Sequence, residues 1–113
     1  MRGAEAEDAA LQLLRRRGLR LVSRNFRCRG GELDLVMLDG DTLVVVEVRA
    51  RRHAGYGSAA ESVDRRKQAR LVHAAQLFLA AHPREAERPL RFDVVAFDGA
   101  GQADWIRAAF DAG

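Results

Sequence analysis

The chain has 113 residues, of which 48% are hydrophobic and 31% charged, and its formal net charge is +3. This length suits a single domain, 1–113, and the composition excludes a disordered tail or a collagen-like fibre. All but one of the 19 basic residues are arginine, so Lys67 is the only lysine in the chain.

The first predicted element is a helix over 3–17. Apolar residues recur in it at helical spacing, and Gly18 ends the pattern. Seven arginines and no acid lie between Ala9 and Gly31, namely Arg15, Arg16, Arg17, Arg20, Arg24, Arg27 and Arg29. Such a segment indicates either a surface that binds a polyanion or arginines that solvate a helix end.

The single cysteine and the short apolar runs indicate the cellular compartment of the protein. Because Cys28 is alone, no intramolecular disulfide can form, which favours a reducing cytoplasm. The N-terminus lacks the apolar stretch of a signal peptide, and the longest apolar run, 77–81, is far below the roughly 20 residues that span a bilayer. We therefore expect a cytoplasmic protein with no membrane span.

Three strands are predicted after the first helix. Alternating apolar residues indicate a strand over 19–26, and two runs rich in valine and leucine follow at 32–38 and 42–49. The Asp-Gly-Asp sequence at 39–41 is typical of a turn, so the last two strands are expected to form a β-hairpin.

The hairpin brings four polar side chains to one face in this prediction. Either two-residue turn places Glu32, Asp34, Glu47 and Arg49 together, because side chains alternate along each strand. A turn at 40–41 sets Asp34 opposite Glu47 and Glu32 opposite Arg49, whereas a three-residue loop needs a bulge to restore the match.

A long helix is predicted over 58–81. Ser58 and Glu61 have the spacing of a capping box, and Lys67 falls on the apolar stripe. A lysine there either extends outward or serves a buried site. A strand over 90–98 follows, and 103–110 is either a strand or a helix.

Glu47 lies in the most valine-rich stretch of the chain, where an unpaired charge is costly. One explanation is that Glu47 pairs with Arg49 or another arginine on a half-exposed face. The other is that Asp34 and Glu47 converge on a divalent cation, for which Mg²⁺ is suited. Glu32 would either join that metal site or pair with Arg49.

Two segments carry a family resemblance, 31–36 (Gly-Glu-Leu-Asp-Leu-Val) and 45–51 (Val-Val-Glu-Val-Arg-Ala-Arg). They resemble the central signature of the YraN-like family of small bacterial proteins, which is similar to the PD-(D/E)xK nucleases and to archaeal-type Holliday junction resolvases. The match extends to the opening helix, Gly18, Asn25, Ser62, Val63, Lys67 and 91–95. It implies an α/β domain of the restriction-endonuclease-like fold, with a mixed central sheet flanked by helices in the order α-β-β-β-α-β-(β or α).

The resemblance also assigns roles to the site residues. It implies that Asp34 and Glu47 bind the metal, Mg²⁺ or Mn²⁺, and that Glu7 is a supporting acid from the first helix. Arg49 occupies the position of the motif's lysine. An arginine can bind phosphate but cannot act as a base, so Lys67 is a candidate substitute.

The resulting hypothesis is a Mg²⁺-dependent nuclease that hydrolyses DNA, including branched or structured DNA. Five arginines near the site would contact the phosphate backbone, or would simply form a solvated surface: Arg51, Arg52, Arg65, Arg66 and Arg70. The alternative is a non-catalytic nucleic-acid-binding or scaffold protein with the same fold. Analogy with resolvases implies a homodimer, and a membrane-surface role is disfavoured because no large apolar helix face is predicted.

Overall fold

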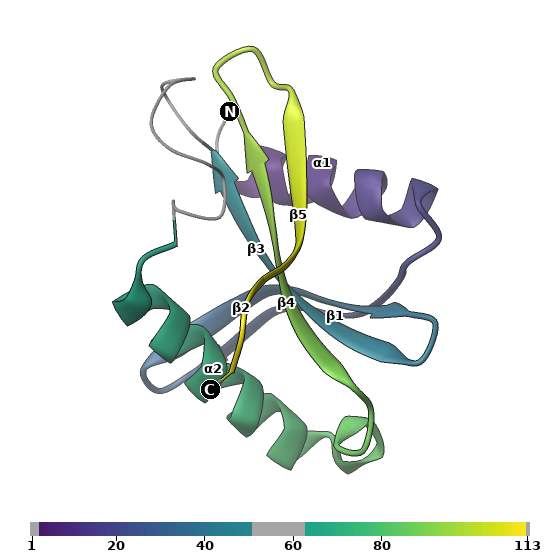
Figure 1. Ribbon diagram of the computed structural model, residues 1–113, viewed down its shortest axis with the longest axis vertical. Helices are drawn as coiled ribbons and strands as arrows, with labels where there is room; N and C mark the ends of the chain where they lie inside the picture. The colour runs from purple at the N-terminus through teal and green to yellow at the C-terminus, as the bar shows by residue number, and fades with distance from the viewer. Residues whose placement is uncertain (1–2, 51–62, 113) are drawn as a thin grey trace.

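The computed structural model describes residues 3–50 and 63–112, which form one five-stranded sheet with a helix on each face (Figure 1). The elements are α1 (Gly3–Arg16), β1 (Arg20–Cys28), β2 (Gly31–Asp39), β3 (Thr42–Ala50), α2 (Arg65–Ala81), the short 3₁₀ helix η2 (Pro83–Glu85), β4 (Leu90–Phe97) and β5 (Ala103–Phe110). The strand order is β1-β2-β3-β4-β5, and only β3 and β4 are parallel. This confirms the predicted α/β class and element order, with a strand as the last element.

The two helices cover opposite faces of the sheet, and each face has its own core. Ala6, Ala10 and Leu14 form the buried stripe of α1, because residues four apart share one side of a helix. They pack in one cluster with the side chains of β2 and β3 that face α1. After α1, Gly18 adopts a φ of 91°, which lets the chain turn directly into β1.

Helix α2 begins later than the sequence pattern predicts. Val63 and Asp64 are not helical, and the side chain of Asp64 caps the helix by accepting a hydrogen bond from the Lys67 backbone N at 2.8 Å. The predicted start at Ser58 is therefore wrong, since the helix is capped at Asp64. The predicted capping residues, Ser58 and Glu61, lie outside the described residues.

Of the two-residue turns that the sequence left open, the structure has the one at 40–41. The ladder of β2 and β3 pairs Asp39 with Thr42 and runs as far as Leu35 with Val46. Beyond that pair the two strands separate: β2 remains paired with β1, and β3 remains paired with β4. The expected direct pairs of residues 34 with 47 and 32 with 49 are therefore not part of the ladder.

Asp34 lies where β2 and β3 separate. Its carboxylate accepts a hydrogen bond from the Val48 backbone N at 2.9 Å, so a side chain replaces the next rung of the ladder. The alternation of side chains along β2 also breaks here. Leu33 and Leu35, two residues apart, would normally share a face, but Leu33 packs with Val36 in the core under α2 and Leu35 packs in the core under α1. The split in the sheet opens a place for polar side chains between two apolar cores.

One buried acid is structural. Asp93 of β4 is fully buried, and its carboxylate accepts hydrogen bonds from the side chains of Arg91 and Trp105 and from the Ala108 backbone N at 2.9 Å. Arg91 also pairs with Asp39, at 2.8 Å. These bonds satisfy the buried charge and fasten the edge strand β5 to the sheet.

Among the described residues, no helix is both long enough and apolar enough to cross a bilayer.

Candidate metal centre

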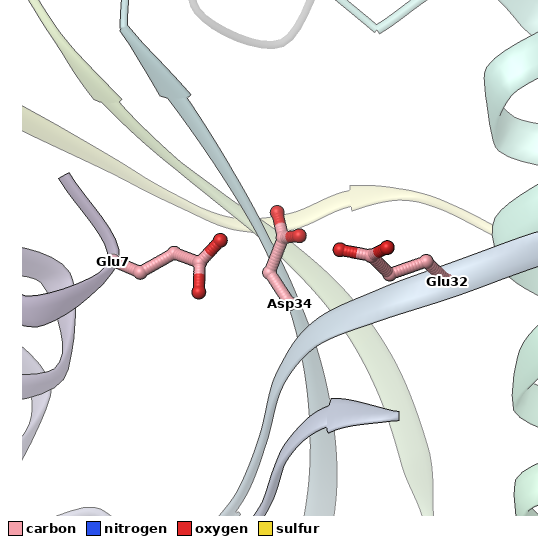
Figure 2. Close-up of side chains that lie close together, drawn as sticks. All are labelled: Glu7, Glu32 and Asp34. Carbon is pink, nitrogen blue, oxygen red and sulfur yellow. The ribbon is translucent and has the colours of Figure 1, made fainter. Parts of the chain in front are cut away.

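Three carboxylates converge at the split between β2 and β3. Figure 2 shows Glu7 of α1 pointing toward Asp34 and Glu32 of β2. One oxygen of each of these carboxylates lies within 4.8 Å of the others, and all three residues are half-buried. The first helix therefore brings an acid to the hairpin, as the family resemblance implied for Glu7.

Glu7 is held in place by two neighbouring residues of β1. The Arg24 Nε lies 3.7 Å from the Glu7 Oε1, and a second guanidinium nitrogen of Arg24 donates to Asp8 at 2.6 Å. The side chain of Asn25 lies close enough to that of Glu7 to lower its pKa, and Asn25 has a φ of 57°, a left-handed conformation that asparagine tolerates better than most residues. Burial first, and then the Asp34 carboxylate, raise the pKa of Glu7 above its usual range.

A fourth carboxylate, that of Glu47 in β3, neighbours Asp34 but is not one of the three clustered acids. Glu47 is only 4% exposed, and its carboxyl group lies beside that of Asp34. Burial and then the proximity of Asp34 raise the pKa of Glu47 to about 8, although Lys67 and Arg49 act in the opposite direction. Without a cation at this position, burial and the Asp34 carboxylate thus disfavour the ionised form of Glu47.

Lys67 and Arg49 supply the positive charge beside Glu47. The Lys67 Nζ lies 3.3 Å from the Glu47 Oε2, so the lysine of α2 reaches inward to a buried acid. Among the described residues, the ion pair of Glu47 is with Lys67 and not with an arginine, while two of the neighbouring arginines, Arg51 and Arg52, lie outside the described residues. Within the described part of the chain, the Glu47 Oε2 and the Arg49 Nε are buried without a hydrogen-bond partner.

Glu32 lies with Glu7 and Asp34 rather than pairing with Arg49 in the described part of the chain. Its carboxylate belongs to the cluster with Glu7 and Asp34, and its ion pair is with Arg27 at 3.5 Å. Arg24 and Arg27 of the basic segment therefore pair with acids around the centre. Part of the charge that the sequence presented as a polyanion-binding surface instead holds the acidic cluster together.

This donor set fits Mg²⁺ or Mn²⁺. All the ligating atoms would be carboxylate oxygens, which hard divalent cations prefer. Burial and the neighbouring Asp34 carboxylate raise the pKa of Glu7 and of Glu47, and no hydrogen-bond donor among the described residues reaches a buried oxygen of Glu47. A cation at this position would remove both costs.

The five arginines that were predicted to contact the phosphate backbone of DNA fall into three groups. Arg66 and Arg70 line a hollow of about 640 Å³ together with Lys67 and Glu32. Arg65 lines a different hollow on α2, beside Gln68 and His73, so it is not brought to the acidic centre. The remaining two arginines, Arg51 and Arg52, lie outside the described residues.

Sequence reasoning assigned neither Arg24 nor Asn25 a role beside Glu7, although both lie next to its side chain. The signal available for Asn25 was its residue type, which is enriched at left-handed positions. No local pattern indicates Arg24, because its partners Glu7 and Asp8 lie on another element.

Comparisons with known proteins place the chain among proteins of similar length. The model of an uncharacterised protein family, UPF0102, matches residues 6–97. A UPF0102 protein of Stutzerimonas stutzeri is 62% identical over 112 residues, covering 96% of this chain and 93% of that protein. UPF0102 proteins of Ectopseudomonas mendocina and Pseudomonas entomophila are 61% and 59% identical, covering 97% and 96% of this chain and 94% and 92% of theirs.

Proposed function

The chain belongs to the UPF0102 family of small bacterial proteins, as the YraN-like resemblance predicted, and from its acidic centre we propose that it is a divalent-metal-dependent nuclease that acts on DNA. One observation carries the proposal. Three carboxylates from α1 and β2 cluster at a split in the sheet, and Glu47 of β3 lies next to one of them, Asp34, with the only lysine of the chain beside it.

The proposed metal ligands are Glu7, Glu32, Asp34 and Glu47. When bound, Mg²⁺ or Mn²⁺ would supply Lewis-acid chemistry at a phosphate and activation of water. The protein's own contribution is orientation: Asp34 is fixed by the Val48 backbone N, and Glu7 by Arg24 and Asn25. Such preorganised carboxylates need little rearrangement when charge develops during hydrolysis.

Arg49 takes the position of the motif's lysine and keeps its charge at all working pH values. It can therefore stabilise the negative charge that builds up on a phosphate but cannot accept a proton. Lys67 provides the second cation of the centre, through its contact with Glu47. The two residues together compensate for the absence of a lysine on β3.

The proposal is tested by incubating the purified protein with supercoiled plasmid, linear duplex and synthetic four-way junctions. We expect cleavage in Mg²⁺ or Mn²⁺ and none in EDTA. An Asp34→Asn variant purified in parallel controls for contaminating nucleases. If every substrate remains intact with both ions at high protein concentration, the nuclease proposal is rejected.

The non-catalytic alternative remains the second candidate because Arg49 replaces the motif's lysine. It predicts that the wild-type protein binds the same DNA, with an affinity that falls steeply as salt increases, without cutting it. Binding without cleavage under every metal condition would favour this alternative.

Two substitutions of Arg49 test whether its positive charge is what cleavage requires. We expect Arg49→Met to slow cleavage by at least about tenfold, because the phosphate loses an electrostatic partner, and Arg49→Lys to retain cleavage. Initial rates should be compared with Mn²⁺ affinities measured by calorimetry, which should be unchanged. An Arg49→Met variant as fast as the wild type would remove Arg49 from the proposed site.

A further inference from the structure

Helix α2 and the turn between β1 and β2 form the walls of a hollow beside the acidic cluster. Arg66, Lys67 and Arg70 line one wall, and Gly30 and Gly31 form the other. Residues 66 and 70 are one helical turn apart, so their side chains lie on the same side of α2. Glu32, a member of the acidic cluster, also lines this hollow of about 640 Å³.

The hollow is built into the fold, because its two walls pack directly on each other. A Cβ atom at Gly31 would lie 2.9 Å from the Arg70 backbone O, so only glycine allows this approach. A ring nitrogen of His73 on α2 lies 3.2 Å from the Arg29 backbone O at the start of the turn. The position of the arginines relative to Glu32 is thereby fixed by backbone contacts.

The arginines of this hollow differ from others near the centre. Arg24 and Arg27 pair with acids, whereas Arg66 and Arg70 are exposed and form no ion pair with any of the described residues. Lys67 lies between them in sequence and reaches the Glu47 carboxylate at 3.3 Å. Positive charge therefore extends from the exposed arginines, Arg66 and Arg70, through Lys67 to the acidic centre.

We propose that this hollow, which we call the α2 groove, holds one strand of nucleic acid by its phosphates. Arg66 and Arg70 bind successive phosphates, and the strand then passes Lys67 to bring a phosphodiester to the carboxylates. This inference rests on the proposed function and adds the path of the substrate. A row of cations that ends at an acidic centre suits a repeating polyanion better than an isolated phosphate, which would require only one cationic site.

The α2 groove also predicts a difference between neighbouring arginines. Arg65 precedes Arg66 on the same helix but lines a separate hollow with Gln68, His73 and Asp111. Arg65 and Arg66 carry the same charge, and both are exposed. Arg65 is therefore a matched control for a contact that depends on position rather than on total charge.

The test measures binding in EDTA, where no cleavage is expected, by fluorescence anisotropy of a short labelled single strand at several salt concentrations. We expect Arg66→Gln and Arg70→Gln each to weaken binding by about three- to tenfold and to reduce the slope of log K against log salt by about 0.7. Arg65→Gln should stay within about twofold of the wild type. Thermal melts of all variants verify folding.

The outcomes separate this inference from the proposed function. Equal losses in all three variants would show that only net charge matters and would overturn the α2 groove, even if the wild-type protein cleaves DNA. Selective losses at Arg66 and Arg70 in a protein that never cleaves would uphold the groove and reject the nuclease. The unchanged binding of both groove variants would also overturn the inference.

Discussion

Replacing Asp34 by asparagine is expected to slow metal-dependent cleavage by at least about 10²-fold and to weaken Mn²⁺ binding by at least about tenfold. Asp34 links the clustered acids to Glu47, because its carboxylate clusters with Glu7 and Glu32 and lies beside that of Glu47. Asparagine keeps an oxygen that can accept the hydrogen bond from the Val48 backbone N. The substitution thus removes charge with little change to the split in the sheet.

Asp41→Asn is the matched control, since Asp41 lies in the turn of the same hairpin and its side chain is 100% exposed. Calorimetric titration with Mn²⁺ and plasmid cleavage rates should be measured on both variants. Asp41→Asn should behave as the wild type. Should Asp34→Asn bind Mn²⁺ with unchanged affinity, the assignment of the metal centre to this cluster would be wrong.

Replacing Glu47 by glutamine is expected to stabilise the metal-free protein at pH 8. The pKa of Glu47 is raised from 4.5 to about 8 in the folded state, so the folded protein retains a proton that the unfolded chain has lost at intermediate pH. The free energy of unfolding therefore falls as pH rises through this window, by up to about 1.4 kcal/mol per pH unit. Glutamine is neutral throughout, and its amide can donate to Asp34.

Thermal unfolding in EDTA between pH 5 and pH 8 measures this effect as a difference between variant and wild type. We expect Glu47→Gln to gain roughly 2–4 kcal/mol relative to the wild type across that range. Glu5→Gln, at an exposed position of α1, should show no such gain. A constant difference between Glu47→Gln and wild type at all pH values would contradict the raised pKa.

Excess Mg²⁺ should reverse the order of stability at pH 8. A ligand that binds only the folded state raises its stability by mass action, and a cation favours the ionised form of Glu47. The wild-type protein should therefore gain more than Glu47→Gln when Mg²⁺ is added. Equal gains in both proteins would place the ion away from Glu47.

The elements whose signals are local could be predicted from the sequence. The turn residues at 40–41 set the register of the hairpin as far as Leu35 and Val46, because turn type and side-chain alternation act over a few residues. The start of α2 could not be predicted from its apolar pattern. Asp64 caps the helix, and a helix start depends on which of several polar residues meets the free backbone N–H groups.

From the sequence by itself, periodicity and turn chemistry predicted the order of helices and strands and the hairpin, the valine run singled out Glu47, and the family resemblance added Glu7. Only the tertiary structure decided which groups meet. Glu7 reaches Asp34 because α1 packs on one face of the sheet, and Lys67 reaches Glu47 because α2 packs on the other. Both side chains reach the centre where β2 separates from β3. This separation results from long-range packing that no short segment encodes.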